Sequence, residues 1–284
     1  MNGTMKLSIL NICLFANPDL SNLMAFPLED TLMLAKELDE NVDLTSYWMS
    51  EKLDGIRAIW TGTQLLTRKG NVIHAPIWFT KQLPNQLLEG ELWAGRGMFH
   101  IVQQTVLDGK PVDEAWRNIQ YMLFDLPNSK QHYKTRYDEL LELGKRVNSD
   151  QILVVKHHSI NSNEDIQNRL DEVLVAGGEG LMLRKTDVPY RHGRSSDLFK
   201  VKKHQDAEAV VIGYKQGKGK YHDKTGSVLV LLESGKQLYI GSGLTDEQRE
   251  NPPPIGSVIT FQYNGFTYKG LPRFPRIMRP AILK

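Results

Sequence analysis

Six consecutive residues, Lys52-Leu53-Asp54-Gly55-Ile56-Arg57, have the types and spacing needed for nucleophilic chemistry at a phosphate. A lysine amine attacks phosphorus only when it is deprotonated, and burial or nearby cations favour that form. Asp-Gly predicts a tight turn that presents the amine, because glycine adopts backbone angles that other residues resist. Arg57 adds a planar fork that suits ribose or phosphate oxygens. The alternative is a surface hairpin with a solvated lysine, since Asp-Gly is also a common turn.

The charge is balanced over the whole chain and uneven along it. The 284 residues are enough for two modest domains or one large one, and the content of 40% hydrophobic and 24% charged residues is ordinary for a globular protein. With 35 Lys and Arg against 33 Asp and Glu, the net charge is +2. Residues 184–224, however, are rich in Lys, Arg and His. Such a strip suits contact with a phosphate backbone, and the alternative is a solvated lysine-rich face.

Three features of the sequence bear on the cellular location of the protein and on its cysteine chemistry. The single cysteine, Cys13, excludes an intrachain disulfide and a cysteine-based zinc site, and no apolar run is long enough to span a membrane. Lys6 followed by the apolar residues 7–16 has the charge, length and hydrophobicity of a short secretory leader. Asn11 interrupts the apolar run and no A-x-A site follows, so a first strand or a disordered tail is the alternative. We therefore treat residues 1–25 as a leader or disordered N-terminus, which favours the periplasm, with the cytoplasm as the alternative.

Residues 26–203 mix strand and helix patterns, which predicts an α+β domain. Two windows have helical periodicity, 133–147 and 166–176, and the second closes at Gly177-Gly178. Strand patterns fall at 48–52, 58–60, 64–67, 87–93, 119–126, 181–183 and 198–202. The domain is therefore expected to hold mixed sheets with helices outside them.

Near residue 203 the sequence pattern changes from mixed helix and strand to strand alone. Short strand patterns follow at 207–213, 227–233, 236–240 and 257–263, separated by Gly, Pro and charged turns. Regularly spaced short strands over about eighty residues suit a five-stranded OB-type barrel. We place the second domain at residues 204–284.

The order of motifs along the chain resembles the covalent nucleotidyltransferases, which are the ATP-dependent DNA ligases, RNA ligases and mRNA capping enzymes. After KLDGIR come an acidic strand, an aromatic-Asp strand, Gly-Glu-Gly at 178–180 and Lys-x-Lys at 200–202. Within this superfamily the chain looks most like the minimal bacterial ATP-dependent DNA ligases, several of which carry periplasmic leaders. The resemblance runs from Leu32 to the C-terminus. It implies an adenylation domain with mixed antiparallel sheets, followed by an OB-fold domain.

The resemblance also implies a set of nucleotide contacts. Lys52 would form the phosphoramidate with AMP, and Phe124 would stack on adenine. Glu179 would hold a divalent metal, with Glu91 as a second ligand that also bonds the ribose hydroxyls. The full set of nucleotide contacts is Glu51, Arg57, Arg68, Glu91, Phe124, Glu179, Lys200 and Lys202. Singly, each has a plainer interpretation: Phe124 as a core residue, Glu91 beside Glu89 as a solvated strand face.

The resemblance also implies basic side chains at the phosphate groups of the nucleotide and of the nick. Arg57 would contact the ribose and the nick, Arg68 the 5′-phosphate, and Lys200 and Lys202 the α-phosphate. Lys200 and Lys202 project to one face of a strand, so an exposed basic edge is the alternative. Residues 272–279 resemble the terminal basic motif that orients pyrophosphate, but the motif lacks the Asp-Lys pair of many relatives. Which of its arginines acts therefore stays open.

No dedicated DNA-binding domain precedes the lysine domain, so the two core domains would have to hold DNA themselves. The contacts would position the phosphate backbone without reading sequence. The candidates are Arg68, Arg184, Lys185, Arg191, Arg194, Lys203, Lys215, Lys218, Lys220, Lys224, Arg273, Arg276 and Arg279.

The reaction implied is the sealing of 5′-phosphate/3′-hydroxyl nicks in duplex DNA through a lysine–AMP intermediate and adenylated DNA. ATP would donate the AMP, Mg²⁺ would serve as the metal with Mn²⁺ as an alternative, and the enzyme would act as a monomer. The rival functions are an RNA ligase, a GTP-using capping enzyme, and a nucleic-acid-binding module without turnover.

Overall fold

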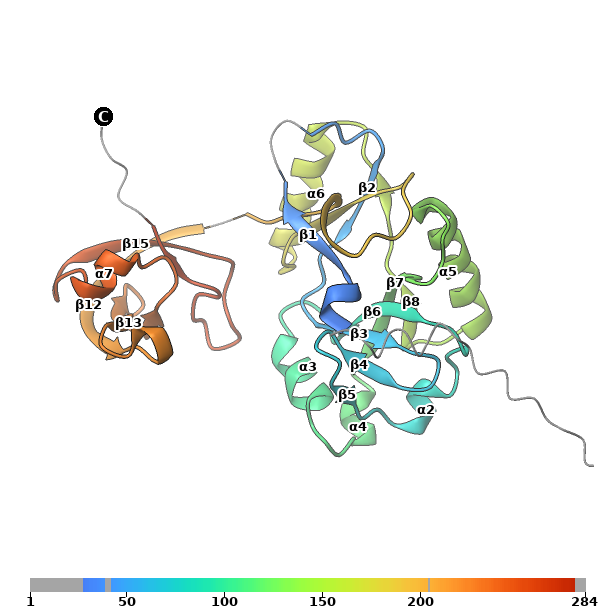
Figure 1. Ribbon diagram of the computed structural model, residues 1–284, viewed down its shortest axis with the longest axis horizontal. Helices are drawn as coiled ribbons and strands as arrows, with labels where there is room; N and C mark the ends of the chain where they lie inside the picture. The colour runs from blue at the N-terminus through green and yellow to red at the C-terminus, as the bar shows by residue number, and fades with distance from the viewer. Residues whose placement is uncertain (1–27, 39–41, 204, 279–284) are drawn as a thin grey trace, which may run out of the picture.

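Three sheets organise the computed structural model, which describes residues 28–38, 42–203 and 205–278 (Figure 1). The first two sheets form a larger domain, and the third curls into a small barrel joined to it by an extended stretch of chain (Figure 1). The predicted leader at residues 1–25, and with it the predicted location, lies outside the described residues and stays a prediction. Within the described part of the chain, no helix is long and apolar enough to cross a membrane.

The first sheet carries the strand that ends at the predicted nucleophile. Its order is β1-β11-β10-β2-β9, and all its pairs are antiparallel except β1 with β11. In that order the strands are Met33–Glu37, Gly193–Val201, Leu181–Lys185, Tyr47–Glu51 and His158–Ser159.

The second sheet has the order β5-β4-β3-β6-β7-β8, with one parallel pair at β7 and β8. Its strands are Val72–Ile73, Leu65–Thr67, Ile56–Trp60, Leu88–Trp93, Gln120–Asp125 and Ile152–Val154. The third sheet has the order β14-β13-β12-β15-β16. Its strands are Gln237–Ile240, Thr225–Leu232, Gln205–Gln216, Val258–Tyr263 and Arg276–Ile277. Each sheet has its own cluster of buried apolar side chains. The predicted mixture of antiparallel sheets is confirmed.

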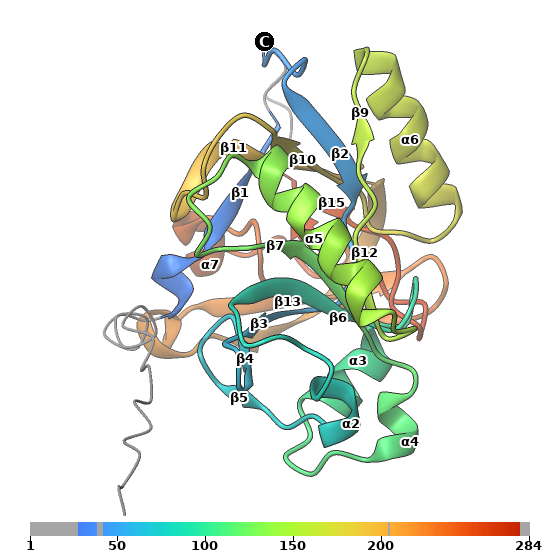
Figure 2. The same cartoon turned by 90° about the vertical axis from the view of Figure 1, so that its right-hand side faces the viewer.

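Helices lie on the outside of the sheets. Figure 2 shows α5 running across in front of β7, and α6 alongside β9. The helical segments are η1 Leu28–Thr31, α2 Ile77–Thr80, α3 Phe99–Val106, α4 Asp113–Trp116, α5 Tyr133–Val147, α6 Asn163–Val175, η2 Gly219–Tyr221 and α7 Asp246–Glu250. The prediction for α5 is confirmed to the residue.

The helix α6 begins earlier than its apolar pattern indicates. Ser162 caps it, because the Ser162 hydroxyl accepts a hydrogen bond from the backbone N–H of Asp165 at 3.1 Å. The first turn is therefore polar, and a prediction that starts at the first apolar residue, Ile166, misses it. The helices α2, α3, α4 and α7 were not predicted, and all four are short.

The domain boundary predicted at residue 203 falls between β11, which ends at Val201, and β12, which begins at Gln205. That boundary stays a prediction. The role predicted for Gly55 needs a correction. Gly55 does not adopt a positive φ. A Cβ atom there would lie 2.2 Å from the carbonyl oxygen of Leu92 in β6, so close approach of β6 is what requires glycine.

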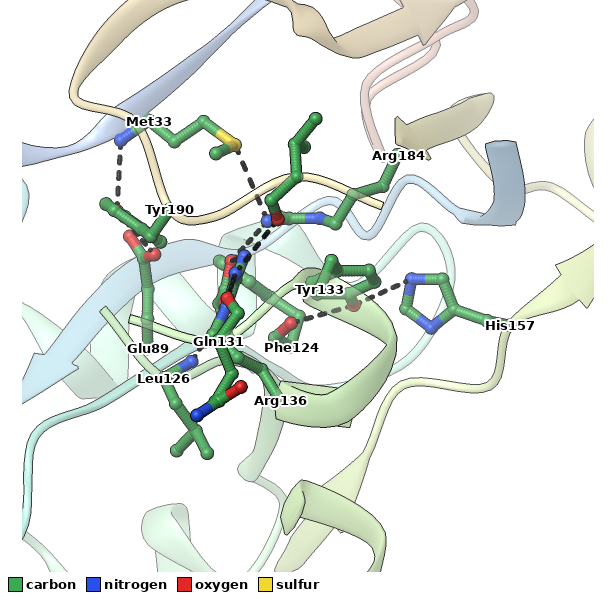
Figure 3. A network of polar contacts seen from close by, with 12 residues as sticks. Met33, Glu89, Phe124, Leu126, Gln131, Tyr133, Arg136, His157, Arg184 and Tyr190 are labelled. Atoms are coloured by element: carbon green, nitrogen blue, oxygen red, sulfur yellow. Dashed lines mark hydrogen bonds and ion pairs between the residues drawn. The ribbon is translucent and has the colours of Figure 1, made fainter. Parts of the chain in front are cut away.

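A buried carboxylate connects the two sheets of the larger domain. Asp125 in β7 is fully buried and accepts a hydrogen bond from Nε of Arg136 in α5 at 2.6 Å. Its other oxygen accepts from the guanidinium of Arg184, in β10 of the first sheet. Nη1 of Arg136 also donates to the carbonyl of Gln131 at 2.6 Å (Figure 3). Because both arginines are buried, each depends on Asp125 for the balance of its charge.

We predict that Asp125→Asn lowers the free energy of unfolding by about 3–5 kcal/mol, since it leaves two guanidinium groups buried without an anion. Chemical denaturation measures the change. The surface ion pair of Lys145 with Glu142 at 2.6 Å provides the control, and Lys145→Ala should change the free energy of unfolding by less than about 1 kcal/mol. Equal effects of the two substitutions would contradict the prediction.

Candidate functional site

A cavity of about 740 Å³ is lined by residues of the first two sheets, their connecting loops and helix α3. Its size falls within the range of roughly 300–1,000 Å³ that is usual for ligand sites. The cavity gathers predicted residues from distant parts of the chain: Glu51, Lys52, Arg57, Arg68, Glu91, Phe124, Arg194 and Lys200. The fold therefore brings together most of the nucleotide contacts that the sequence predicted.

Glu179 lies between two ammonium groups. Its Oε2 accepts a hydrogen bond from Nζ of Lys52 at 2.5 Å, and its Oε1 accepts one from Nζ of Lys202. Burial by itself would raise the pKa of the Glu179 carboxyl, but the two lysines hold it below its ordinary value. The carboxylate is therefore ionised at neutral pH and fixes the Lys52 side chain in place.

The backbone of the Gly-Glu-Gly segment makes this arrangement possible. The backbone N–H of Lys52 donates to the carbonyl of Gly180 at 2.8 Å. Gly180 has a φ of +153°, and a Cβ atom there would lie 2.3 Å from the carbonyl oxygen of Val201. Only glycine lets the chain pass between the nucleophile and β11 and still place Glu179 beside Lys52.

Glu91 is a second carboxyl in the same place. Burial raises the pKa of Glu91 to about 8, Lys52 and Arg57 oppose that shift, and the negative charge of Glu179 adds to it. At neutral pH Glu91 is mostly protonated, and an arriving cation would ionise it. Two carboxylates suit Mg²⁺, which completes its shell with phosphate oxygens and water. Among the described residues no group of three His, Cys, Asp or Glu side chains could hold a metal ion.

A buried carboxylate also holds Arg57. Nε of Arg57 donates to Oε1 of Glu89 at 2.7 Å, and Nη1 donates to the carbonyl of Met33 at 2.9 Å. The hydroxyl of Tyr190 donates to Oε2 of Glu89 at 2.9 Å and accepts from the N–H of Met33 at 3.0 Å (Figure 3). Glu89 is fully buried, so the alternative of a solvated acidic strand face is wrong.

Phe124 presents its ring to the cavity between two cations. The guanidinium carbons of Arg57 and Arg184 each lie 5.7 Å from the ring centroid. The backbone carbonyl of Phe124 accepts a hydrogen bond from the Tyr133 hydroxyl at 3.0 Å, which fixes the strand beneath the ring. The half-buried ring can therefore stack on a planar base, as predicted.

His157 lines the cavity beside Tyr133, and the sequence reasoning missed it. Its Nε2 lies 3.1 Å from the Tyr133 hydroxyl, and its Nδ1 lies 3.1 Å from the carbonyl of Val155 (Figure 3). Burial, followed by the charge of Arg184, lowers the pKa of His157 to about 3. The ring is therefore neutral at physiological pH. Its side-chain partner Tyr133 lies 24 residues away, so no local pattern indicates it.

The barrel reaches the site through Arg273. The guanidinium of Arg273 donates two hydrogen bonds to the Asp54 carboxylate, and the bond from Nη2 to Oδ1 measures 2.8 Å. Asp54 was predicted only as part of a turn. Arg276 in the same terminal motif is exposed, and Arg279 lies outside the described residues. No described barrel residue lines the cavity itself.

Arg184 does not lie where DNA could contact it. Its side chain is buried, bonded to Asp125 and part of the cavity lining, so it belongs to the inner wall of the cavity and not to the exposed DNA surface. Three candidates form surface ion pairs that DNA phosphates would have to replace: Arg191, Lys203 and Lys224. The exposed or half-exposed candidates are Arg68, Lys185, Arg191, Arg194, Lys203, Lys215, Lys218, Lys220, Lys224, Arg273 and Arg276.

Glu51, a predicted nucleotide contact, is held by a residue that the sequence reasoning missed. Arg96 donates to both oxygens of the Glu51 carboxylate, from Nε at 2.8 Å and from Nη2 at 2.7 Å. Lys200, on the same side of the cavity, pairs with Glu37 at 2.8 Å. A phosphate that binds Lys200 would therefore have to displace Glu37.

The sequence is similar to known ligases over nearly its whole length. The sequence model of the ATP dependent DNA ligase domain matches residues 32–202, and that of the DNA ligase OB-like domain matches residues 216–280. A DNA ligase of Haemophilus influenzae is 32% identical over 255 residues, which cover 90% of this chain and 93% of that protein.

Solved structures agree in fold. A structure from an analysis of Lig E DNA ligases superimposes with a TM-score of 0.83 at 39% identity, covering 87% of this chain and 98% of that one. A Chlorella virus DNA ligase-adenylate gives a TM-score of 0.54 at 26% identity, covering 89% and 98%. The predicted pairing of a nucleotidyltransferase domain with an OB-fold domain is confirmed.

We predict that the neutral state of His157 makes the fold sensitive to acid. The folded-state pKa lies below that of the unfolded chain, so stability is fully present above about pH 6.5 and declines as the pH falls toward 3. From about pH 7 to about pH 5 the free energy of unfolding should fall by about 2 kcal/mol more in the wild type than in His157→Gln. Denaturant titrations at both pH values measure this, and parallel losses in the two proteins would refute it.

Proposed function

We propose roles for the site residues of this chain, which belongs to the family of ATP-dependent DNA ligases. Its function is the ATP-dependent joining of DNA, as the sequence predicted. A capping enzyme or a binding module without turnover no longer fits that family. The observation that carries the residue roles is the position of the Lys52 amine in the cavity, bonded to Glu179 at 2.5 Å.

In the first step, Nζ of Lys52 attacks the α-phosphorus of ATP. A P–N bond forms, the bond to the β-phosphate oxygen breaks, and pyrophosphate leaves. Lys52 must lose a proton first, and its pairing with Glu179 has to loosen for that to happen. Lys200 and Lys202 are proposed to balance the α-phosphate charge, which is supported by Lys200 lining the cavity and by Lys202 sharing Glu179 with Lys52.

Glu91 and Glu179 are proposed to hold the divalent metal. Their donor set fits Mg²⁺, and the raised pKa of Glu91 describes a carboxyl that ionises when a cation arrives. A bound metal would supply positive charge at the transferring phosphate. In the absence of any nucleotide, Glu179 holds the Lys52 amine in place.

The second and third steps use DNA. AMP passes from Lys52 to the 5′-phosphate at a nick, which breaks the P–N bond and forms a phosphoanhydride. The 3′-hydroxyl then attacks the 5′-phosphorus and AMP leaves. Arg68 lines the cavity and is proposed to bind the 5′-phosphate. The exposed cations are proposed to contact the phosphate backbone of nicked duplex DNA, with the chain acting as a monomer.

We predict that Lys52→Ala separates these steps. The variant should lose sealing of a 5′-phosphate nick with ATP by at least about a thousandfold, because the AMP acceptor is gone. It should still seal a nick that is supplied already adenylated, since the attack by the 3′-hydroxyl does not use the lysine amine. Gel-based sealing assays with the two substrates measure both activities.

The matched control is Lys145→Ala, because Lys145 is an exposed lysine in a surface ion pair. It should seal both substrates like the wild type. The proposal fails if Lys52→Ala seals with ATP at the wild-type rate, or if it loses both activities to the same extent.

A further inference from the structure

One loop of the barrel packs against the start of a helix in the larger domain. We call residues Asn264–Arg273, between β15 and β16, the docking loop. Its ends are paired, because the N–H of Asn264 donates to the carbonyl of Arg273 at 2.9 Å and the N–H of Arg273 donates to the carbonyl of Gly265 at 3.0 Å. Nζ of Lys236 donates to the carbonyl of Lys269 at 2.6 Å near the tip. Tyr268 at the tip and Arg273 at the base therefore belong to one braced hairpin.

The docking loop meets the start of α3. The rings of His100 and Tyr268 are stacked, with centroids 4.3 Å apart and an angle of 25° between their planes. The guanidinium carbon of Arg273 lies 5.6 Å from the ring centroid of Phe99. Nδ1 of His100 is buried and has no hydrogen-bond partner in the part of the chain that the structure describes. The stack on Tyr268 is therefore a contact of the His100 ring that no hydrogen bond from Nδ1 supplements in the described part of the chain.

The segment before α3 is anchored at its other end. We call residues Gly95–His100 the support segment. Gly95 and Gly97 have φ values of +103° and +72°, and this turn directs Arg96 back toward β2. There Arg96 forms its two hydrogen bonds with Glu51, the residue that precedes the nucleophile. A bidentate arginine–carboxylate pair fixes orientation as well as distance.

We infer that Arg96 and His100 are positioning residues for closure of the barrel. Arg96 fixes the support segment to the end of β2. This places the His100 ring where Tyr268 can stack on it. This inference rests on the proposed division of the reaction into steps. In this docked position Arg273 contacts Asp54 and no described barrel residue lines the cavity, so we assign the position to the steps in which the barrel holds DNA.

The test compares two rates in the same full-length proteins: formation of Lys52–AMP from ATP, and sealing of a pre-adenylated nick. In Tyr268→Ala, the KM for the pre-adenylated nick should rise roughly fivefold, as the loss of one aromatic stack predicts. Formation of Lys52–AMP should be unchanged. Tyr268→Phe keeps the ring and should behave like the wild type in both assays.

Arg96→Gln should lower the ratio of sealing to Lys52–AMP formation by a similar factor. The double variant Arg96→Gln/Tyr268→Ala should be no worse than the worse single variant, because both substitutions break the same connection. Arg169→Gln is the matched control. Arg169 has the same exposed fraction as Arg96, 34%, and a comparable 2.8 Å bond to Glu172, and it should leave both rates unchanged.

Three outcomes would overturn the inference. Multiplicative effects in the double variant would show that Arg96 and Tyr268 act separately. Equal loss of sealing in Tyr268→Phe and Tyr268→Ala, or no loss in either, would show that the stack does not position the barrel. These outcomes are distinguishable from a failure of the proposed residue roles, because in that case the wild type itself would form no Lys52–AMP.

Discussion

The carboxylate of Glu179, shared between the ammonium groups of Lys52 and Lys202, is the interaction on which the rest of the site depends. A lysine that is to attack phosphorus needs a fixed position. The anion that balances its charge must also be one that an incoming phosphate can replace. Glu179 supplies the position through one short bond to each lysine, and the incoming phosphates can take over its role as counter-ion. The requirement for glycine at Gly180 follows directly, since a side chain there would push Glu179 away from the amine.

Beneath the cavity, a layer of buried charge gives this arrangement its rigidity (Figure 3). Asp125 joins the two sheets through Arg184 and ties α5 to them through Arg136, while Glu89 orients Arg57 at the rim of the cavity. Burying so many charges carries a large desolvation free energy unless each has a hydrogen-bonded partner. The cations that contact the Phe124 ring are thus fixed before any nucleotide arrives, which lowers the entropy lost on binding.

The sequence predicted the residues that carry chemistry because they stand in short motifs: Lys52 in KLDGIR, Glu179 between glycines, Lys200 and Lys202 on one strand face. It misjudged residues whose role depends on distant partners. Arg184 stands in a basic stretch and was assigned to DNA, yet Asp125, 59 positions away, draws it into the interior. Arg96 and His157 carry no local signal, because the contacts that define them involve Glu51 and Tyr133. Helix α5 was predictable from its periodicity. Helix α3 has only 8 residues, which is too short to show a clear helical period.

The claim that most needs a direct measurement is that Lys52 accepts the AMP. The protein should first be rinsed with pyrophosphate to remove any AMP it already carries, then incubated with ATP and a divalent metal, digested, and examined by peptide mass mapping. The mechanism predicts one AMP on the peptide that contains Lys52, and none anywhere in Lys52→Ala. An adduct on another residue, or no adduct on the rinsed wild type, would contradict it.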